Sequence, residues 1–226
     1  MFVLYIISCY DKKNKSQYLE MLNVKERIMK KVIQNIFSHL HYNSVVILTM
    51  TFLSLFALLL QQIPGGNFTR LLFSVYRSSP YDIFFYFRLF GHVLGHGGWD
   101  HYIGNFLMIL MVGPMLEEKY GSKNLVIMIL ITALVTGLLN IFLFRGVAIM
   151  GASGIVFMFI LLSSFVNVKE GKIPMTFILV IVIYLGGEII DGIFVKDNVS
   201  QFGHIIGGIC GSMFGFLMNL KYKKGA

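Results

Sequence analysis

Six stretches of mainly apolar residues, each long enough to cross a lipid bilayer, constrain the fold of this chain most strongly. A transmembrane helix needs about 20 such residues, and a helix satisfies its backbone hydrogen bonds within its own segment. Only 13% of the residues are charged, whereas a soluble domain carries about a quarter. We therefore predict an all-α integral membrane protein. The expected spans are Ser44–Ile63, Trp99–Leu116, Asn124–Phe144, Met150–Val168, Ile173–Ile190 and Ser200–Leu220.

Basic residues are distributed unevenly between the two ends of these spans. Cytoplasmic connections carry an excess of Lys and Arg, so the asymmetry places both termini in the cytoplasm. It also accounts for the formal charge of +8 without a nucleic-acid partner. The second, fourth and sixth spans then all begin at the outer face, where their first turns lie at similar depth. The basic residues on the predicted cytoplasmic side are Lys12, Lys13, Lys15, Lys25, Arg27, Lys30, Lys31, Lys119, Lys123, Lys169, Lys172, Lys221, Lys223 and Lys224.

The remaining segments suggest three parts. We expect a cytoplasmic N-terminal extension at residues 1–43, a six-helix domain at residues 44–220 and a basic cytoplasmic tail at residues 221–226. Residues 64–98, between the first two spans, are too apolar for a water-exposed loop, so we expect them to lie in the membrane interface or to re-enter it. The two cysteines provide neither a disulfide framework nor a metal-ligand spacing.

A serine between small residues opens the fourth span, in Gly151-Ala152-Ser153-Gly154. In the first turns of a helix the backbone N–H groups have no helical partner, and the helix dipole favours negative charge there. Ser153 is therefore placed as a nucleophile whose developing oxyanion could be stabilised. Taken alone, the pattern favours simple helix packing, because small residues are common where membrane helices approach closely.

A histidine lies beside a stripe of glycines in the sixth span. Gly203, Gly207, Gly211 and Gly215 recur at intervals of four, which makes one face of the helix smooth enough for close packing. Ionisable residues within a span are costly and are functional candidates by default. His204 is either a functional group brought against a neighbouring helix or a histidine paired to a backbone carbonyl.

A donor pair stands near the start of the second span. His101 and Asn105 are one helical turn apart, so they share a face, and both side chains can donate hydrogen bonds. Their alternative role is a polar clamp between helices. A nucleophile at Ser153, a base at His204 and this pair together form a hydrolytic constellation. No buried carboxylate is evident to orient His204, so the arrangement is a dyad rather than a triad.

In these residues the chain closely resembles the rhomboid family of intramembrane serine proteases. The family's G-x-S-G motif corresponds to residues 151–154, its sixth-span histidine and glycine motif to residues 203–211, and its H-x-x-x-N motif to residues 101–105. The upstream His92 and His96 also resemble family positions. Together, in this order and on these spans, the motifs are highly specific.

The resemblance implies a Ser153–His204 dyad that cleaves transmembrane segments of membrane proteins near the outer boundary. It also implies an oxyanion hole lined by His101, Asn105 and the backbone N–H of Ser153, without a cofactor or a metal. The residues expected to support this site are Gly151, Gly154, Phe157, Gly207 and Gly211.

The same resemblance implies a rhomboid-like bundle of six transmembrane helices, of the bacterial type, with a membrane-embedded first loop at residues 64–98. The short third loop, at residues 145–150, would lie over the site. The expected location is the cell membrane, as a multi-pass protein whose site opens to the extracytoplasmic side. Its partners would be transmembrane protein substrates and the lipid bilayer.

Four positions depart from the family pattern. Gly203 stands where alanine is frequent, and Phe157 stands where many relatives have a tyrosine against the catalytic histidine; its ring can still stack. The family's Trp-Arg pair is Phe87-Arg88 here. The family's Glu-x-Arg after the second span is Glu117-Glu118-Lys119, and Lys lacks the bidentate geometry of Arg.

Three other functions are alternatives to a serine protease. A catalytically silent relative would bind membrane proteins without cutting them, although such relatives usually lack the serine or the histidine. A small transporter would use the same polar residues as a pathway, but neither an inverted repeat nor a pair of broken helices is visible. A metalloprotease needs a motif such as H-E-x-x-H, and the His92 and His96 spacing lacks a convincing third ligand, which favours structural or gating roles.

Overall fold

The computed structural model describes residues 20–35, 38, 42–63, 68–166, 173–185 and 201–224. The chain divides into two compact units, Met1–Tyr42 and Asn43–Ala226. Within the first unit, residues 20–35 form one helix. In the described part of the second unit the regular structure is helical apart from one isolated bridge, between Val75 and Ile149. The predicted all-α class is therefore confirmed for these residues.

Each predicted span contains a helix in the structure. By length and composition alone, α6 and residues 201–220 of α10 qualify as membrane-crossing helices, whereas α2 and α7 are shorter apolar helices. The helices are α2 (Val45–Gln61), α5 (Trp99–Tyr120), α6 (Ser122–Leu143), α7 (Ser153–Ser163), α8 (Met175–Val180) with the π-helical turn η2 (Ile181–Leu185), and α10 (Gln201–Lys224).

Two predicted boundaries were wrong. The expected spans left residues 117–123 as a connection, but α5 and α6 are separated by Gly121 alone, which has a φ of 80° that favours glycine. Charged residues there continue the helices instead of ending them. The fourth span was predicted at Met150–Val168, whereas α7 has only 11 residues, about 16 Å of helix.

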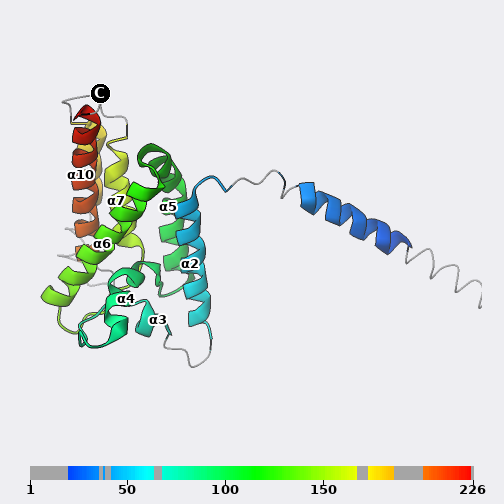
Figure 1. The fold of residues 1–226 in the computed structure, drawn as a ribbon, viewed down its shortest axis with the longest axis horizontal. Helices are drawn as coiled ribbons and strands as arrows, with labels where there is room; N and C mark the ends of the chain where they lie inside the picture. Colours follow the sequence, from blue (N-terminus) through cyan, green and yellow to red (C-terminus); the bar gives the residue numbers. More distant parts are fainter. Residues whose placement is uncertain are drawn as a thin grey trace, which may run out of the picture. The chain divides into compact units, whose positions relative to one another are not determined.

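The short helix α7 forms the centre of the bundle. It packs against α5, α6, α8 and α10, and Figure 1 shows α7 beside α10. Because neighbours surround it, a uniformly apolar sequence suits this helix better than an amphipathic one. Its buried residues are Ile155, Val156, Phe157, Met158, Phe159, Ile160, Leu161 and Leu162.

The predicted first loop folds into short helical elements. They are α3 (Phe68–Leu72), α4 (Ile83–Gly91) and the 3₁₀ turn η1 (His92–Leu94). Helices α3 and α4 lie at the end of the bundle opposite the C-terminal end of α10 (Figure 1). Asp82 caps α4 by accepting a hydrogen bond from the Phe84 N–H at 2.9 Å.

A buried arginine holds this loop together. Arg88 is 1% exposed and donates to the Leu71 carbonyl at 3.1 Å, to Ser78 Oγ at 2.6 Å and to Asp82 Oδ2 at 2.6 Å. Its guanidinium also lies 4.6 Å from the centre of the Tyr76 ring. The hydrogen bond from Arg88 is the main cause that lowers the pKa of Asp82. This arginine therefore joins α3, the following loop and α4.

Near the C-terminal end of α5, a glutamate serves as the N-terminal cap of α2. Glu117 accepts hydrogen bonds from the Val46 N–H at 3.0 Å, from the Ile47 N–H at 3.3 Å and from the hydroxyl of Ser44. It also accepts from Ser122 Oγ at 2.7 Å. One carboxylate thus satisfies orphan donors of α2 and joins three helices.

We expect Glu117→Gln to destabilise the folded protein by about 2 kcal/mol, because hydrogen bonds to a charged acceptor are worth more than those to an amide. The amide nitrogen also cannot accept from the α2 N–H groups. Unfolding of the purified protein in mixed detergent micelles would measure the loss. Glu118→Gln is the matched control, since Glu118 is the adjacent, exposed residue. Equal stability of the two variants would contradict the capping role.

Candidate active site

The contact between α7 and α10 is close enough for backbone to touch backbone. A Cβ atom added to Gly207 would overlap the carbonyl oxygen of Gly154 and lie 2.8 Å from its carbonyl carbon. A Cβ on Gly211 would overlap the carbonyl oxygen of Met158 in the same way, and a Cβ on Gly154 would lie 3.3 Å from the Gly203 carbonyl oxygen. The predicted glycine stripe of the sixth span is therefore the surface on which α7 rests.

This packing brings His204 against α7. His204 is 6% exposed, and its ring stacks on Phe157 with centroids 4.5 Å apart and an interplanar angle of 6°. The phenylalanine ring thus does stack on this histidine without the hydroxyl of a tyrosine. Phe157 lies one turn after Ser153, the first residue of α7, so the two share a face of the helix. The stack thus places His204 beside the first turn of α7.

The segment leading into Ser153 is fixed by backbone hydrogen bonds to the first loop. Ile149 exchanges two bonds with Val75, of 2.9 and 3.0 Å, and the Gly151 N–H donates to the His92 carbonyl at 2.9 Å. Asn140 of α6 donates to the Val147 carbonyl at 3.1 Å. Gly151 has a φ of 130°, which L side chains rarely adopt. The chain therefore enters α7 along one defined path.

The donor pair of α5 faces this segment. An added Cβ at Gly151 would lie 2.8 Å from Nε2 of His101 and 3.8 Å from Nδ2 of Asn105. Both side chains come from the first turns of α5, as the sequence predicts. The glycine at position 151 therefore leaves room for the imidazole, and a larger residue would displace it.

His96 is a part of the site whose role the sequence did not specify. Its Nδ1 lies 3.2 Å from the Leu94 carbonyl, which requires an N–H there, so Nε2 is the acceptor. Nε2 then accepts from Asn105 Nδ2 at 3.1 Å and from the Ala152 N–H at 3.4 Å. His96 thereby joins the donor pair to the residue before Ser153.

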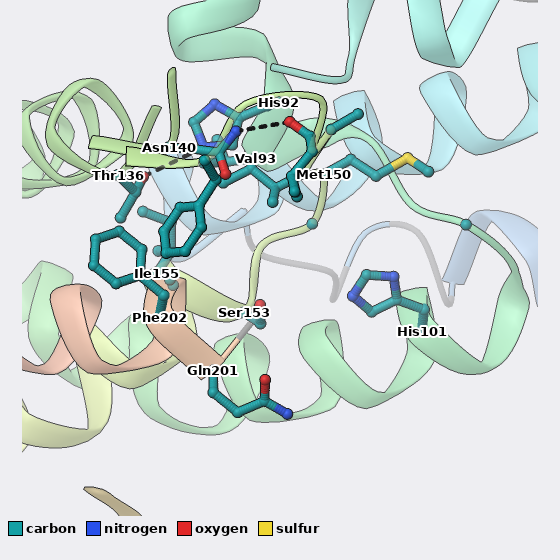
Figure 2. Close-up of a pocket in the computed structure, with 18 of the residues that line it drawn as sticks. His92, Val93, His101, Thr136, Asn140, Met150, Ser153, Ile155, Gln201 and Phe202 are labelled. Carbon is teal, nitrogen blue, oxygen red and sulfur yellow. Dashed lines mark hydrogen bonds between the residues drawn. The ribbon is translucent and has the colours of Figure 1, made fainter. Parts of the chain in front are cut away.

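A cavity of about 940 Å³ opens at the first turns of α5, α7 and α10, which contribute His101, Ser153 and Gln201 to its lining (Figure 2). His92 and Thr136 line another part of its wall, with His92 Nε2 and Thr136 Oγ1 3.3 Å apart. The first turns of the second, fourth and sixth predicted spans therefore line one cavity. Asn105 and His204 are buried and do not belong to the lining.

His92 and His96 have separate partners. The ring of His92 bonds to the Arg88 carbonyl at 3.1 Å, whereas His96 bonds to Leu94 and Asn105. Within the described part of the chain, no group of three His, Cys, Asp or Glu side chains is arranged to hold a metal ion. The two histidines therefore bond within the first loop and also to α5, α6 and the segment before α7.

A family model and a curated relative match parts of this chain. A family model for the rhomboid domain matches residues 85–221, a region that contains His101, Asn105, Ser153 and His204. The chain is similar to RHOMBOID-like protein 4 of Arabidopsis thaliana, with 29% identity over 133 residues. That match covers 56% of this chain and 32% of the relative, so the similarity spans about a third of the relative's length.

Proposed function

Because the chain belongs to the rhomboid family, and is thus a multi-pass membrane protein, we propose that it is an intramembrane serine endopeptidase. Ser153 is the nucleophile, His204 is the base, and His101, Asn105 and the Ser153 N–H bind the oxyanion. The proposal rests above all on the stack of His204 against Phe157. This contact brings a histidine to the helix that begins with a pocket-lining serine.

In the proposed reaction, His204 takes the proton of the Ser153 hydroxyl while Oγ of Ser153 attacks a peptide carbonyl carbon. The carbonyl oxygen becomes the oxyanion, and each donor around it is worth roughly 3 kcal/mol where water is excluded. His204 then returns the proton to the leaving amine, and the acyl-enzyme forms. Water that enters through the cavity hydrolyses this ester, again with His204 as the base.

The substrate of this reaction is a transmembrane segment that can unwind. In a regular helix the scissile carbonyl is hydrogen-bonded and shielded, so segments with Gly, Pro or small residues near the membrane boundary are favoured. We assign the protease domain to six spans within residues 44–220, with residues 64–98 embedded in the membrane. In this topology residues 1–43 and 221–226 are cytoplasmic, and the cavity opens to the extracytoplasmic side of the cell membrane.

Covalent labelling by a fluorophosphonate probe tests this proposal. We expect the folded wild-type protein in detergent micelles to be labelled at Ser153, as located by peptide mass spectrometry. Protein denatured beforehand should not be labelled, because the probe requires an activated serine. A folded protein that resists the probe and leaves a single-span reporter intact would instead be a catalytically silent relative that binds membrane proteins.

A further inference from the structure

The helix at residues 20–35 carries an apolar face that its own unit leaves uncovered. It lies outside the region matched by the family model, residues 85–221, and every one of its residues is exposed. Ile28 and Val32 are 58% and 52% exposed. On a helical projection its apolar residues occupy about half of the circumference. These residues are Met21, Leu22, Val24, Ile28, Met29, Val32 and Ile33.

The same helix is basic. Its four cationic residues outnumber its two acidic residues, Glu20 and Glu26, so its net charge is +2. Glu26 is paired with Lys30 at 2.6 Å, one turn away. A basic helix with a broad apolar face is typical of segments that lie in a membrane interface. The cationic residues are Lys25, Arg27, Lys30 and Lys31.

The position of Lys25 indicates whether lipid or a groove on a protein covers the apolar face. On the helical projection it lies near the middle of the apolar face, between Ile28 and Leu22. In a protein groove this ammonium would be a buried charge that needs a partner. At a bilayer its four-carbon stem lies along the acyl chains while the ammonium reaches the headgroups. The position of this lysine therefore favours lipid as the occupant.

The chain holds this helix close to a membrane. Residue 35 is the last residue of the described helical stretch and Val45 begins α2, so ten residue steps separate them and reach at most about 36 Å. In the proposed topology α2 enters the bilayer from the cytoplasmic leaflet, which is the leaflet with negative surface potential. Tethering makes binding intramolecular, so a weak intrinsic affinity is sufficient.

We propose that residues 20–35 form an interfacial helix that binds the anionic lipids of the cytoplasmic leaflet. The apolar face enters the boundary between headgroups and acyl chains. The cationic residues contact phosphate and carboxylate groups of the headgroups. This surface is independent of catalysis, and it should behave identically in a Ser153→Ala protein.

A fluorescent label on the apolar face tests this assignment in the full chain. The Met29→Cys protein, with Cys9→Ser and Cys210→Ala, carries an environment-sensitive label and is reconstituted in phosphatidylcholine vesicles with or without ~30% phosphatidylglycerol. We expect nitroxide on the lipid acyl chains to quench the label in the anionic vesicles. Replacing Arg27, Lys30 and Lys31 by Gln should lower the bound-to-free ratio about a hundredfold, since each charge contributes about fivefold.

Two double variants with equal charge change separate the apolar face from net charge. Ile28→Asp with Val32→Asp should abolish quenching, because both residues lie near the centre of the apolar face. Asn23→Asp with Gln34→Asp lies on the opposite face and should lower the bound-to-free ratio by only about 25-fold, which is what two charges contribute. Equal losses in the two variants, or an unquenched label in anionic vesicles, would overturn the proposal. A label whose burial follows the protein-to-lipid ratio would indicate that a second copy covers the face.

Discussion

Replacement of Ser153 by alanine is expected to reduce cleavage of a single-span reporter by at least about 10⁴-fold, to the background of the assay. The residue is the first of α7 and lines the cavity, and no substitute nucleophile enters the proposed reaction. His204→Ala should have a loss of similar size, because a serine hydroxyl is a weak nucleophile without a base. The measurement is the initial rate in reconstituted vesicles.

A double variant of both residues and a matched serine variant serve as controls for this prediction. Because the two residues act as a unit, Ser153→Ala with His204→Ala should be no slower than either single variant. Ser163, at the other end of α7, donates to the Ile160 carbonyl at 2.7 Å, and Ser163→Ala should retain activity. Undiminished cleavage by both single variants would eliminate the dyad. Full activity of His204→Ala alone would assign the base to another residue.

The sequence located the candidate residues within their helices more accurately than it located the ends of those helices. Motif spacing placed Ser153, His204 and the His101 and Asn105 pair on the first turns of three helices. Alternating spans then placed those turns at similar depth, and the cavity lining agrees. The expectation rests on successive spans running in opposite directions through a membrane, so that the order along the chain determines which ends meet.

Positions that depend on tertiary contacts were not predictable in this way. In the sequence Glu117 is only the first residue of Glu117-Glu118-Lys119, but its function depends on the N-terminus of α2 lying beside it. His96 similarly acquires its role from Ala152, 56 residues later. The length of α7 was overestimated because a uniformly apolar stretch has the same composition whether neighbouring helices or lipid surround it.

Gly207→Ala is expected to be the most damaging change to the fold of the site. The added methyl would overlap the carbonyl oxygen of Gly154, and since that atom is backbone, a rotamer change cannot relieve the contact. Overpacking of this kind costs about 3 kcal/mol, which exceeds the ~1 kcal/mol that alanine contributes to helix propensity. We expect a net destabilisation of about 2 kcal/mol, measured by unfolding in mixed micelles.

The loss of activity should exceed what this destabilisation explains. A protein that remains folded accommodates the methyl by moving α10 away from α7, and His204 moves with it. A displacement of about 1 Å at the reacting groups costs on the order of 10²-fold in rate. Gly104→Ala is the matched control, because nothing lies within 4 Å of its added Cβ, and it should preserve both stability and rate. A folded Gly207→Ala protein with wild-type turnover would show that the close approach of α7 and α10 is needed for packing and not for positioning the base.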